Sequence, residues 1–426
     1  MLSKEENDLL TRVGPGTPGG DLLRRYWQPV ALAEELPPDG PPIPVRLLGE
    51  DLVLFREPSL GPGEPGRPGL LGIHCAHRGA DLSYGRLEDG GLRCIYHGWL
   101  YDGRGRCLEQ PGEPAGSTFH ERVRQPAYPC QEVGGLILAY LGPGEPPLVP
   151  NYEFLTAPQE QCYPTKLFQE CSYLQGNEGN IDPSHHSFLH LRYGEGEDSQ
   201  FTWYAGDRSP TIETEETAYG ARIYAIRRID EHRNYIKITN FILPNLSAIS
   251  GDADGYGVNW HVPIDDTHHW KYNLTFRRSR AIDKAVRARG RTSMTADYHP
   301  IRHKENRYQQ DRAEMRGITF AGLGRDFQAQ DACVTEGAGP IQDRSTEHLG
   351  YTDKGIIAAR KVLLRALRAS QAGQDPAHVI RDPADNSFSD LFARKDVVPV
   401  ELGWSRYWER EAAEGQRVLA LTTGTA

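Results

Sequence analysis

Two short motifs, each with one cysteine and one histidine, constrain this chain more than any other feature of its sequence. The first runs Cys75-Ala76-His77-Arg78-Gly79, and the second runs Cys94-Ile95-Tyr96-His97-Gly98. Each motif offers one thiolate and one imidazole, which are common metal ligands in proteins. The glycines just beyond the histidines suit tight turns packed against a metal centre. The sequence therefore predicts that two loops jointly hold one metal centre.

The mixed order of cysteine and histidine favours an iron–sulfur cluster over zinc. In a Rieske cluster of two irons and two sulfides, two histidines replace two cysteines on one iron, which raises the potential. We expect Cys75 and Cys94 to bind one iron and His77 and His97 to bind the other. Zinc takes the same donors, but its usual spacing keeps the two cysteines together and the two histidines together.

The composition is that of a globular protein with two domains. The chain has 426 residues, of which 38% are hydrophobic and 25% are charged, as is usual for globular proteins. Its net charge is −10, and no run of Lys or Arg is present, so we expect no nucleic-acid partner. It has no apolar stretch of about 18 residues and no signal-peptide core, so we expect no membrane association. Seven cysteines at scattered spacing are no disulfide framework, and we expect a cytoplasmic location.

Breaks in the sequence pattern divide the chain into three parts. A Gly/Pro-rich segment at residues 142–147 interrupts the strand pattern and predicts a domain boundary. We therefore expect an N-terminal helical segment over residues 1–27, a small β domain with the cluster over 28–145, and a second domain over 146–426.

Within the second domain, alternating polar and apolar residues predict an antiparallel sheet between residues 211 and 276. Helical spacing of apolar residues predicts a helix from residue 352. The polar segment 291–316 is expected to be a lid or an interface arm, and the tail from residue 412 is expected to be frayed.

A second candidate metal site lies in the stretch from Asp182 to His190. Two histidines and one carboxylate, with open positions opposite, are the ligands of non-haem Fe(II) that activates O2. We choose His185 and His190, and the Asp-Pro pair 182–183 predicts a helix start with Asp182 at its N-cap. Five residues turn about 140° on an ideal helix, so the helix must be broken or bulged between the two histidines. His186, four residues before His190, is the alternative first ligand.

A similar pattern occurs once more, at Asp265-Asp266-Thr267-His268-His269. It repeats the Asp-x-x-His spacing but has no histidine five residues further on. Because it lies between strand-like segments, as a hairpin turn would, we interpret it as structural.

These motifs, in this order and at these distances, resemble the catalytic subunit of Rieske non-haem iron oxygenases. Segments 12–18, 260–266 and 339–350 resemble the branch of that family with phthalate dioxygenase and aromatic O-demethylases. The resemblance covers nearly the whole chain and implies an α+β fold. The implied fold consists of a small antiparallel β Rieske domain and a helix-grip catalytic domain with an antiparallel sheet and helices. It also implies a homotrimer, alone or stacked as a hexamer, and a separate reductase with flavin and an iron–sulfur cluster.

The resemblance also implies two further site residues. The third iron ligand in the family is an aspartate well after the histidine pair, followed closely by a glutamate, and Asp331 matches it. Asp326, Asp343 and Asp353 are the alternatives. The family has an aspartate between its two metal sites as well, and Asp182 matches that residue.

The two candidate metal sites and the resemblance together imply a function. The chain would be an oxygenase component that takes NAD(P)H electrons from a partner reductase and uses O2 to hydroxylate or O-demethylate an aromatic, carboxylated compound. It would hold one [2Fe–2S] cluster and one Fe(II), with NAD(P)H and flavin only on the reductase. One alternative is a Rieske electron carrier without a second iron, and another is a structural zinc protein. No residue of the sequence identifies the substrate pocket, which we expect between the strands of 211–276 and the segment 291–316.

Overall fold

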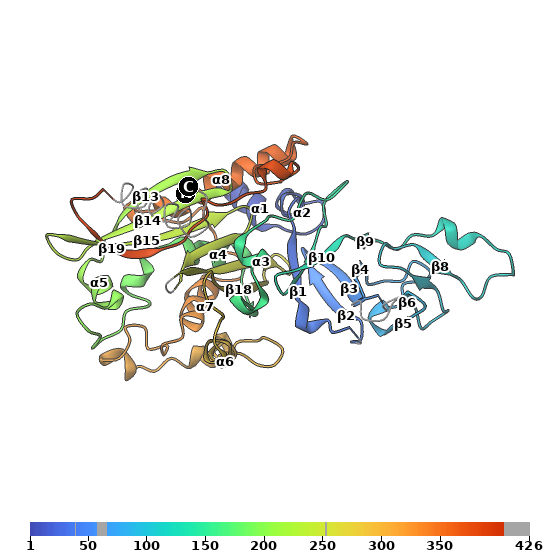
Figure 1. The fold of residues 1–426 in the computed structure, drawn as a ribbon, viewed down its shortest axis with the longest axis horizontal. Coiled ribbons are helices and arrows are strands. Elements are labelled where there is room, and N and C mark those ends of the chain that lie inside the picture. The colour runs from blue at the N-terminus through green and yellow to red at the C-terminus, as the bar shows by residue number, and fades with distance from the viewer. Residues whose placement is uncertain (39, 58–65, 252–253, 404–426) are drawn as a thin grey trace, which may run out of the picture.

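This computed structural model describes residues 1–38, 40–57, 66–251 and 254–403 (Figure 1). The expected frayed tail from residue 412 lies outside the described residues. Figure 1 shows two bodies side by side, the β-rich cluster domain at the right and the larger sheet-and-helix domain at the left. Within the part that the structure describes, no helix is both long and apolar enough to cross a membrane.

Two N-terminal helices, α1 (Lys4–Thr11) and α2 (Pro18–Arg24), pack between the two bodies. Ser3 caps α1 in a capping box, because its hydroxyl accepts from the Glu6 amide and the Glu6 carboxylate accepts from the Ser3 amide, both at 3.0 Å. Arg24, at the end of α2, reaches Glu50 of the cluster domain at 2.8 Å. The N-terminal segment therefore ties the two bodies together.

The cluster domain consists of three small antiparallel sheets. The first orders β1 (Gln28–Leu32), β11 (Leu136–Ala139) and β10 (Cys130–Val133). The second orders β2 (Ile43–Leu47), β3 (Glu50–Arg56), β4 (Pro68–Gly72) and β9 (Ala127–Tyr128). The third orders β5 (Arg86–Glu88), β6 (Gly91–Arg93), β7 (Leu100–Tyr101) and β8 (Cys107–Glu109). The first metal loop follows β4 and the second connects β6 to β7, so two different sheets position the two loops.

The larger domain is built on one antiparallel sheet. Its order is β12 (Cys162–Gln169), β18 (His269–Arg277), β17 (Gly255–Pro263), β16 (Leu246–Ser250), β15 (Arg233–Ile242), β14 (Gly220–Arg228) and β13 (Thr211–Thr217). Strand β19 (Lys395–Pro399) pairs with the free part of β15. The antiparallel sheet predicted between residues 211 and 276 is confirmed. The domain boundary predicted at 142–147 stays a prediction, and these residues lie between β11 and helix α3 (Glu153–Thr156).

Helices cover one face of this sheet, and they carry or flank the candidate metal ligands. Helix α4 (Tyr173–Ile181) packs on β15 to β18, α5 (Gln200–Gly206) packs on β14, and α8 (Lys354–Gln371) packs on β13 and β14. Helix α7 (Phe327–Gly337) packs on α4 from the side, and α6 (Lys284–Arg291) lies at the lower edge of Figure 1. The helix predicted from residue 352 is confirmed as α8.

A buried network of charges fixes α4 in this layer. Glu178 accepts from the guanidinium groups of Arg344 at 2.9 Å and of Arg360 at 2.6 Å, and Arg360 also binds Glu347. Arg344 is fully buried. Burial alone would raise the pKa of Glu178, but the two arginines outweigh it and lower the pKa. The network joins α4 to α8 and to the segment between α7 and α8.

We predict that Glu178→Ala lowers the free energy of unfolding by roughly 3–5 kcal/mol, because it leaves two buried guanidinium groups without their shared carboxylate. Urea denaturation followed by circular dichroism measures the change. Glu216→Ala is the matched control, since Glu216 pairs with Arg365 on the surface, and exposed pairs contribute about 0–1 kcal/mol. Equal effects of the two substitutions would contradict the structural role of this network.

Candidate metal centres

The two cysteine–histidine loops have the same backbone geometry. The Gly79 amide donates to the Cys75 carbonyl at 2.8 Å, and the Gly98 amide donates to the Cys94 carbonyl at 3.0 Å. Both glycines have positive φ, +75° for Gly79 and +77° for Gly98, a conformation that favours glycine. The tight turns predicted from the two glycines are confirmed.

The four side chains of these loops are arranged by donor type. Cys75 and Cys94 are buried, whereas His77 is half-buried and His97 is exposed. The rings of His77 and His97 lie edge to face with centroids 4.5 Å apart. Burial raises the pKa of the Cys94 thiol, and the nearby Cys75 adds to this effect. Two thiolates inside and two imidazoles toward the surface match the donor set of a Rieske cluster.

Neighbouring side chains hold these loops in place. Gln125, which is buried, accepts from the Ala76 amide at 2.8 Å and donates to the His74 carbonyl at 2.8 Å. Across the loops, the Arg78 guanidinium lies over the Tyr96 ring, 4.9 Å from its centroid. Sequence reasoning missed Gln125, because it lies far from both motifs along the chain.

The second candidate site begins where α4 ends. The predicted helix with Asp182 as its N-cap is wrong, because α4 ends at Ile181 and Asp182 is its C-cap residue. Pro183 excludes the preceding residue from the α region, and Asp182 has extended φ and ψ of −89° and 108°. The Asp182 Oδ1 then accepts from the Ser184 amide at 2.7 Å. One 3₁₀ turn, His185–Ser187, follows.

The end of α4 and the turn that follows it bring three candidate donors together. The Nε2 atoms of His185 and His190 lie 3.1 Å apart. Asp331 Oδ1, from α7, lies 3.1 Å from His190 Nε2 and 3.9 Å from His185 Nε2. Two ligands at right angles, each about 2.1 Å from a metal, would lie about 3 Å apart. No continuous α-helix carries both histidines, as their spacing requires, because α4 ends before them and only a 3₁₀ turn follows. The three donors fit one metal ion.

His186 lies beside this site, but both of its ring nitrogens are already engaged. The ring nitrogens of His185, His186 and His190 approach one another within 4.8 Å. However, His186 Nδ1 donates to the Pro183 carbonyl at 2.9 Å, and its Nε2 accepts from Lys237 Nζ at 2.7 Å. Burial lowers the pKa of His186 well below its usual value, and Lys237 adds to the effect. Its geometry therefore favours His185 as the first ligand.

Each candidate ligand has a partner on its outward side, as is usual for metal ligands. Gln330 Oε1 accepts from His190 Nδ1 at 2.6 Å, and Gln330 Nε2 donates to the Gly324 carbonyl at 2.6 Å. Asp182 Oδ2 lies 3.6 Å from His185 Nδ1. Lys271 Nζ lies 4.0 Å from Asp331 Oδ2. Sequence reasoning missed Gln330 and Lys271, since neither belongs to a motif of known spacing.

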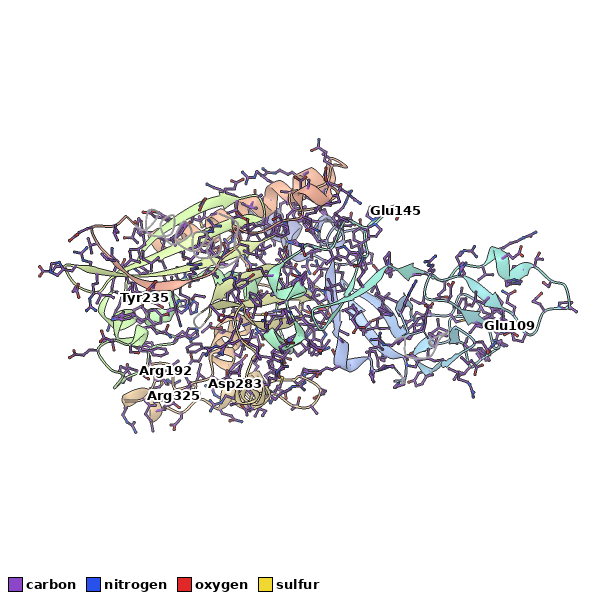
Figure 2. All side chains as sticks on the ribbon, in the orientation of Figure 1. Glu109, Glu145, Arg192, Tyr235, Asp283 and Arg325 are labelled. Atoms are coloured by element: carbon purple, nitrogen blue, oxygen red, sulfur yellow. The ribbon has the colours of Figure 1, made fainter. Side chains whose placement is uncertain are left out.

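The charge of Asp331 is stabilised despite its burial. Burial alone would raise the pKa of Asp331, but His190, Lys271 and His185 outweigh it and lower the pKa well below the usual range. Asp331 therefore stays ionised at neutral pH, as a metal ligand must. Arg192 helps to fix α7 beside the histidines, because its Nη2 donates to the Arg325 carbonyl at 3.1 Å, and Figure 2 labels both residues.

The alternative aspartates have local structural partners. Asp326 caps α7 by accepting from the Gln328 amide at 3.0 Å, and Asp343 accepts from the Ser345 amide at 3.0 Å. Asp353 accepts from the Gly350 amide at 2.6 Å. These bonds are typical of caps and turns.

The repeated Asp-x-x-His pattern is also a turn. Asp265 Oδ1 accepts from the amides of Thr267 at 2.8 Å and His268 at 2.9 Å, between β17 and β18. His269 is buried in β18 and shares a hydrogen bond of 2.9 Å with His261. The hairpin turn predicted for this pattern is confirmed.

Family models match both bodies of the chain. The Rieske [2Fe–2S] domain model matches residues 26–129, and the model described as LigXa C-terminal domain like matches residues 139–423. Solved structures share the fold. The oxygenase in a ferredoxin complex of carbazole 1,9a-dioxygenase has a TM-score of 0.56 at 20% identity, with 92% of this chain and 99% of that chain covered.

Curated relatives are more similar in sequence. The phthalate 4,5-dioxygenase oxygenase subunit of Pseudomonas putida is 37% identical, with 88% of each chain covered. The 5,5'-dehydrodivanillate O-demethylase oxygenase subunit of Sphingobium sp. is 35% identical, with 91% of this chain and 85% of that protein covered. The chain therefore belongs to the Rieske oxygenase family, as an oxidoreductase of the branch with phthalate dioxygenase and O-demethylase oxygenase subunits.

Proposed function

We propose that this chain is an oxygenase component that uses O2 to hydroxylate or O-demethylate an aromatic compound with a carboxylate. The observation that carries the proposal is the convergence of His185 Nε2, His190 Nε2 and Asp331 Oδ1 within 3.9 Å in a chain with a Rieske domain. A pure electron carrier has no use for this second donor set. The names of relatives support the substrate class, since they include phthalate, dehydrodivanillate, 3-chlorobenzoate and phenoxybenzoate.

The proposed cofactors are one [2Fe–2S] cluster and one Fe(II) per chain. Cys75 and Cys94 would bind one iron of the cluster, and His77 and His97 the other. The residues His185, His190 and Asp331 would bind Fe(II).

The proposed electron source is NAD(P)H, through a partner reductase with flavin. Ile95 is 61% exposed and Tyr96 is 56% exposed beside His97, an apolar surface suited to protein contact. A ferredoxin is the partner in the carbazole dioxygenase complexes. We also propose a homotrimer, alone or stacked as a hexamer, and a cytoplasmic location.

Side chains next to the ligands of both proposed centres hold or tune those ligands. When bound, the cluster passes single electrons and the Fe(II) activates O2. The Tyr101 hydroxyl lies 3.2 Å from Cys75 Sγ, and hydrogen bonds to sulfur help to set the potential of a cluster. Gln330 keeps His190 in the tautomer with Nε2 free, and Lys271 faces the Asp331 oxygen turned away from the histidines.

We predict that Cys75→Ser and His97→Ala each abolish the red-brown colour and the rhombic electron paramagnetic resonance signal of the reduced cluster. Either change removes one of the four ligands that the cluster requires. Cys333→Ser is the control and keeps both signals, because Cys333 lies on α7 outside the two loops. A Cys75→Ser sample with an unchanged visible spectrum would contradict the cluster assignment.

For the second site, we predict that His185→Ala, His190→Ala and Asp331→Ala each lower the iron content from about three to about two atoms per chain, because the cluster keeps its two irons. Turnover is lost while the cluster colour stays. Inductively coupled plasma mass spectrometry measures the iron. His186→Ala, the control, keeps about three atoms. Loss of iron in His186→Ala with normal iron in His185→Ala would show that the first ligand is misplaced.

A further prediction concerns Asp182, which we propose as the link between a neighbouring subunit's cluster and this iron. Its side chain is 24% exposed and lies beside His185. Asp182→Asn retains the oxygen that accepts from Ser184 but removes the charge, so cluster, iron and trimer remain while turnover nearly stops. Stopped-flow absorbance of a single turnover measures cluster reoxidation. Reoxidation at the normal rate would leave Asp182 with a structural role only.

A further inference from the structure

Lys237 is a half-buried lysine beside the candidate iron site, and it forms no ion pair with a carboxylate of the described residues. Two fully buried lysines of this domain each have an acidic partner: Lys166 pairs with Glu35 at 2.7 Å, and Lys271 faces Asp331 at 4.0 Å. Lys237 donates to His186 Nε2 at 2.7 Å. Across the residues that the structure describes, no carboxylate lies within ion-pair distance of its ammonium group.

Other cations surround Lys237 on the same face of the sheet. Lys395 of β19 lies directly opposite it in the β15–β19 register, and like charges in that relation are unfavourable. Arg227 of β14 lies opposite Tyr235, two residues before Lys237 on β15, and Figure 2 labels Tyr235. Burial lowers the pKa of Lys237 to about 7, and Lys395 and Arg227 add to this effect.

Arg227 extends the excess of positive charge. It is fully buried, and its Nη2 donates to the Pro183 carbonyl at 2.8 Å and to Ser187 Oγ at 3.1 Å. Its Nε and Nη1 have no hydrogen-bond partner in the part of the chain that the structure describes. Removing a cation from water costs several kcal/mol. Asp207 and Asp182 offset part of this cost for Arg227, but neither forms an ion pair with it. Two cations without a direct ion pair beside the candidate metal site suit an anionic group of a ligand.

Lys237 can reach such a ligand, whereas Arg227 cannot. Part of the Lys237 side chain stays accessible, as do the side chains of His185 (17%) and Asp331 (18%). His186 takes one of the three N–H groups of the ammonium, so two remain to donate. Asp331 attracts Lys237 only from beyond ion-pair distance, because its Oδ1 faces the histidines and its Oδ2 faces Lys271.

We propose that Lys237 binds the carboxylate of the aromatic substrate and so holds its ring beside the metal bound by His185, His190 and Asp331. This proposal rests on the proposed function and names the residue that selects the substrate class. The carboxylate supplies the direct ion pair that Lys237 lacks, and the nearby Arg227 adds to the attraction. An uncharged aromatic compound would leave the ammonium uncompensated, so it is rejected.

The test compares charged and neutral ligands on the protein loaded with cluster and iron. The probes are benzoate, phthalate and 3-methoxybenzoate, each paired with its uncharged amide, and isothermal titration calorimetry measures binding without turnover. We expect Lys237→Met to weaken binding of the carboxylates roughly 10- to 100-fold, the usual range for a lost charge-assisted hydrogen bond. The amides change less than about threefold. Lys237→Arg retains most of the preference, because it retains the charge.

Lys361→Met is the matched control, since it makes the same substitution at an exposed lysine of α8. It leaves both affinities unchanged. Equal weakening of carboxylates and amides in Lys237→Met would overturn the proposal and leave Lys237 as a support for His186. If Lys237→Met does not fold, the wild-type protein still decides, because binding the amides as tightly as the carboxylates, or binding no carboxylate, also overturns it.

Different experimental results would refute the role of Lys237 and the proposed function. A protein with about three irons per chain that oxidises aromatic compounds without preferring carboxylates refutes the role of Lys237 alone. A protein without the second iron refutes the oxygenase mechanism, whatever the calorimetry finds.

Discussion

The proline at position 183 is the constraint on which the second metal site depends. It ends α4 at Ile181 and forces the chain through an extended residue into one 3₁₀ turn. An unbroken helix would turn His185 and His190 about 140° apart, yet here their Nε2 atoms lie 3.1 Å apart. The rest of the domain supports this break, because Arg360 of α8 and Arg344 before α8 hold Glu178 of α4, and α7 brings Asp331 to the open side.

Around this break, the chain provides different partners for chemically different ligands. An amide oxygen faces His190, a carboxylate faces His185, and an ammonium faces Asp331. Both ring nitrogens of His186, next to His185 in sequence, are engaged by a backbone carbonyl and Lys237. Among the three neighbouring histidines, hydrogen bonds and not sequence position therefore favour His185 and His190 as the candidate ligands.

Features within one short segment could be predicted from the sequence, and features that depend on strand register could not. The four cluster residues and the His185/His190 pair each lie in a local motif of fixed spacing. Asp331 required a family resemblance, because residues 191–330 separate it from the histidines. Lys237 and Lys271 come from strands β15 and β18, and a slip of one residue would turn either side chain to the other face. The wrong helix start at Asp182 has a different, local cause, since an Asp-Pro pair suits both the end of one helix and the start of another.

The two histidines of the second site differ in how firmly they are held, and this difference implies an order of metal entry. His190 Nδ1 is fixed at 2.6 Å by Gln330, which is itself fixed by Gly324. His185 Nδ1 stands 3.6 Å from Asp182, whose other oxygen is committed to the Ser184 amide. In the proposed iron site, His190 and Asp331 would therefore form the firmly held part that an ion meets first. His185 would be the ligand that is free to turn its ring and complete the set.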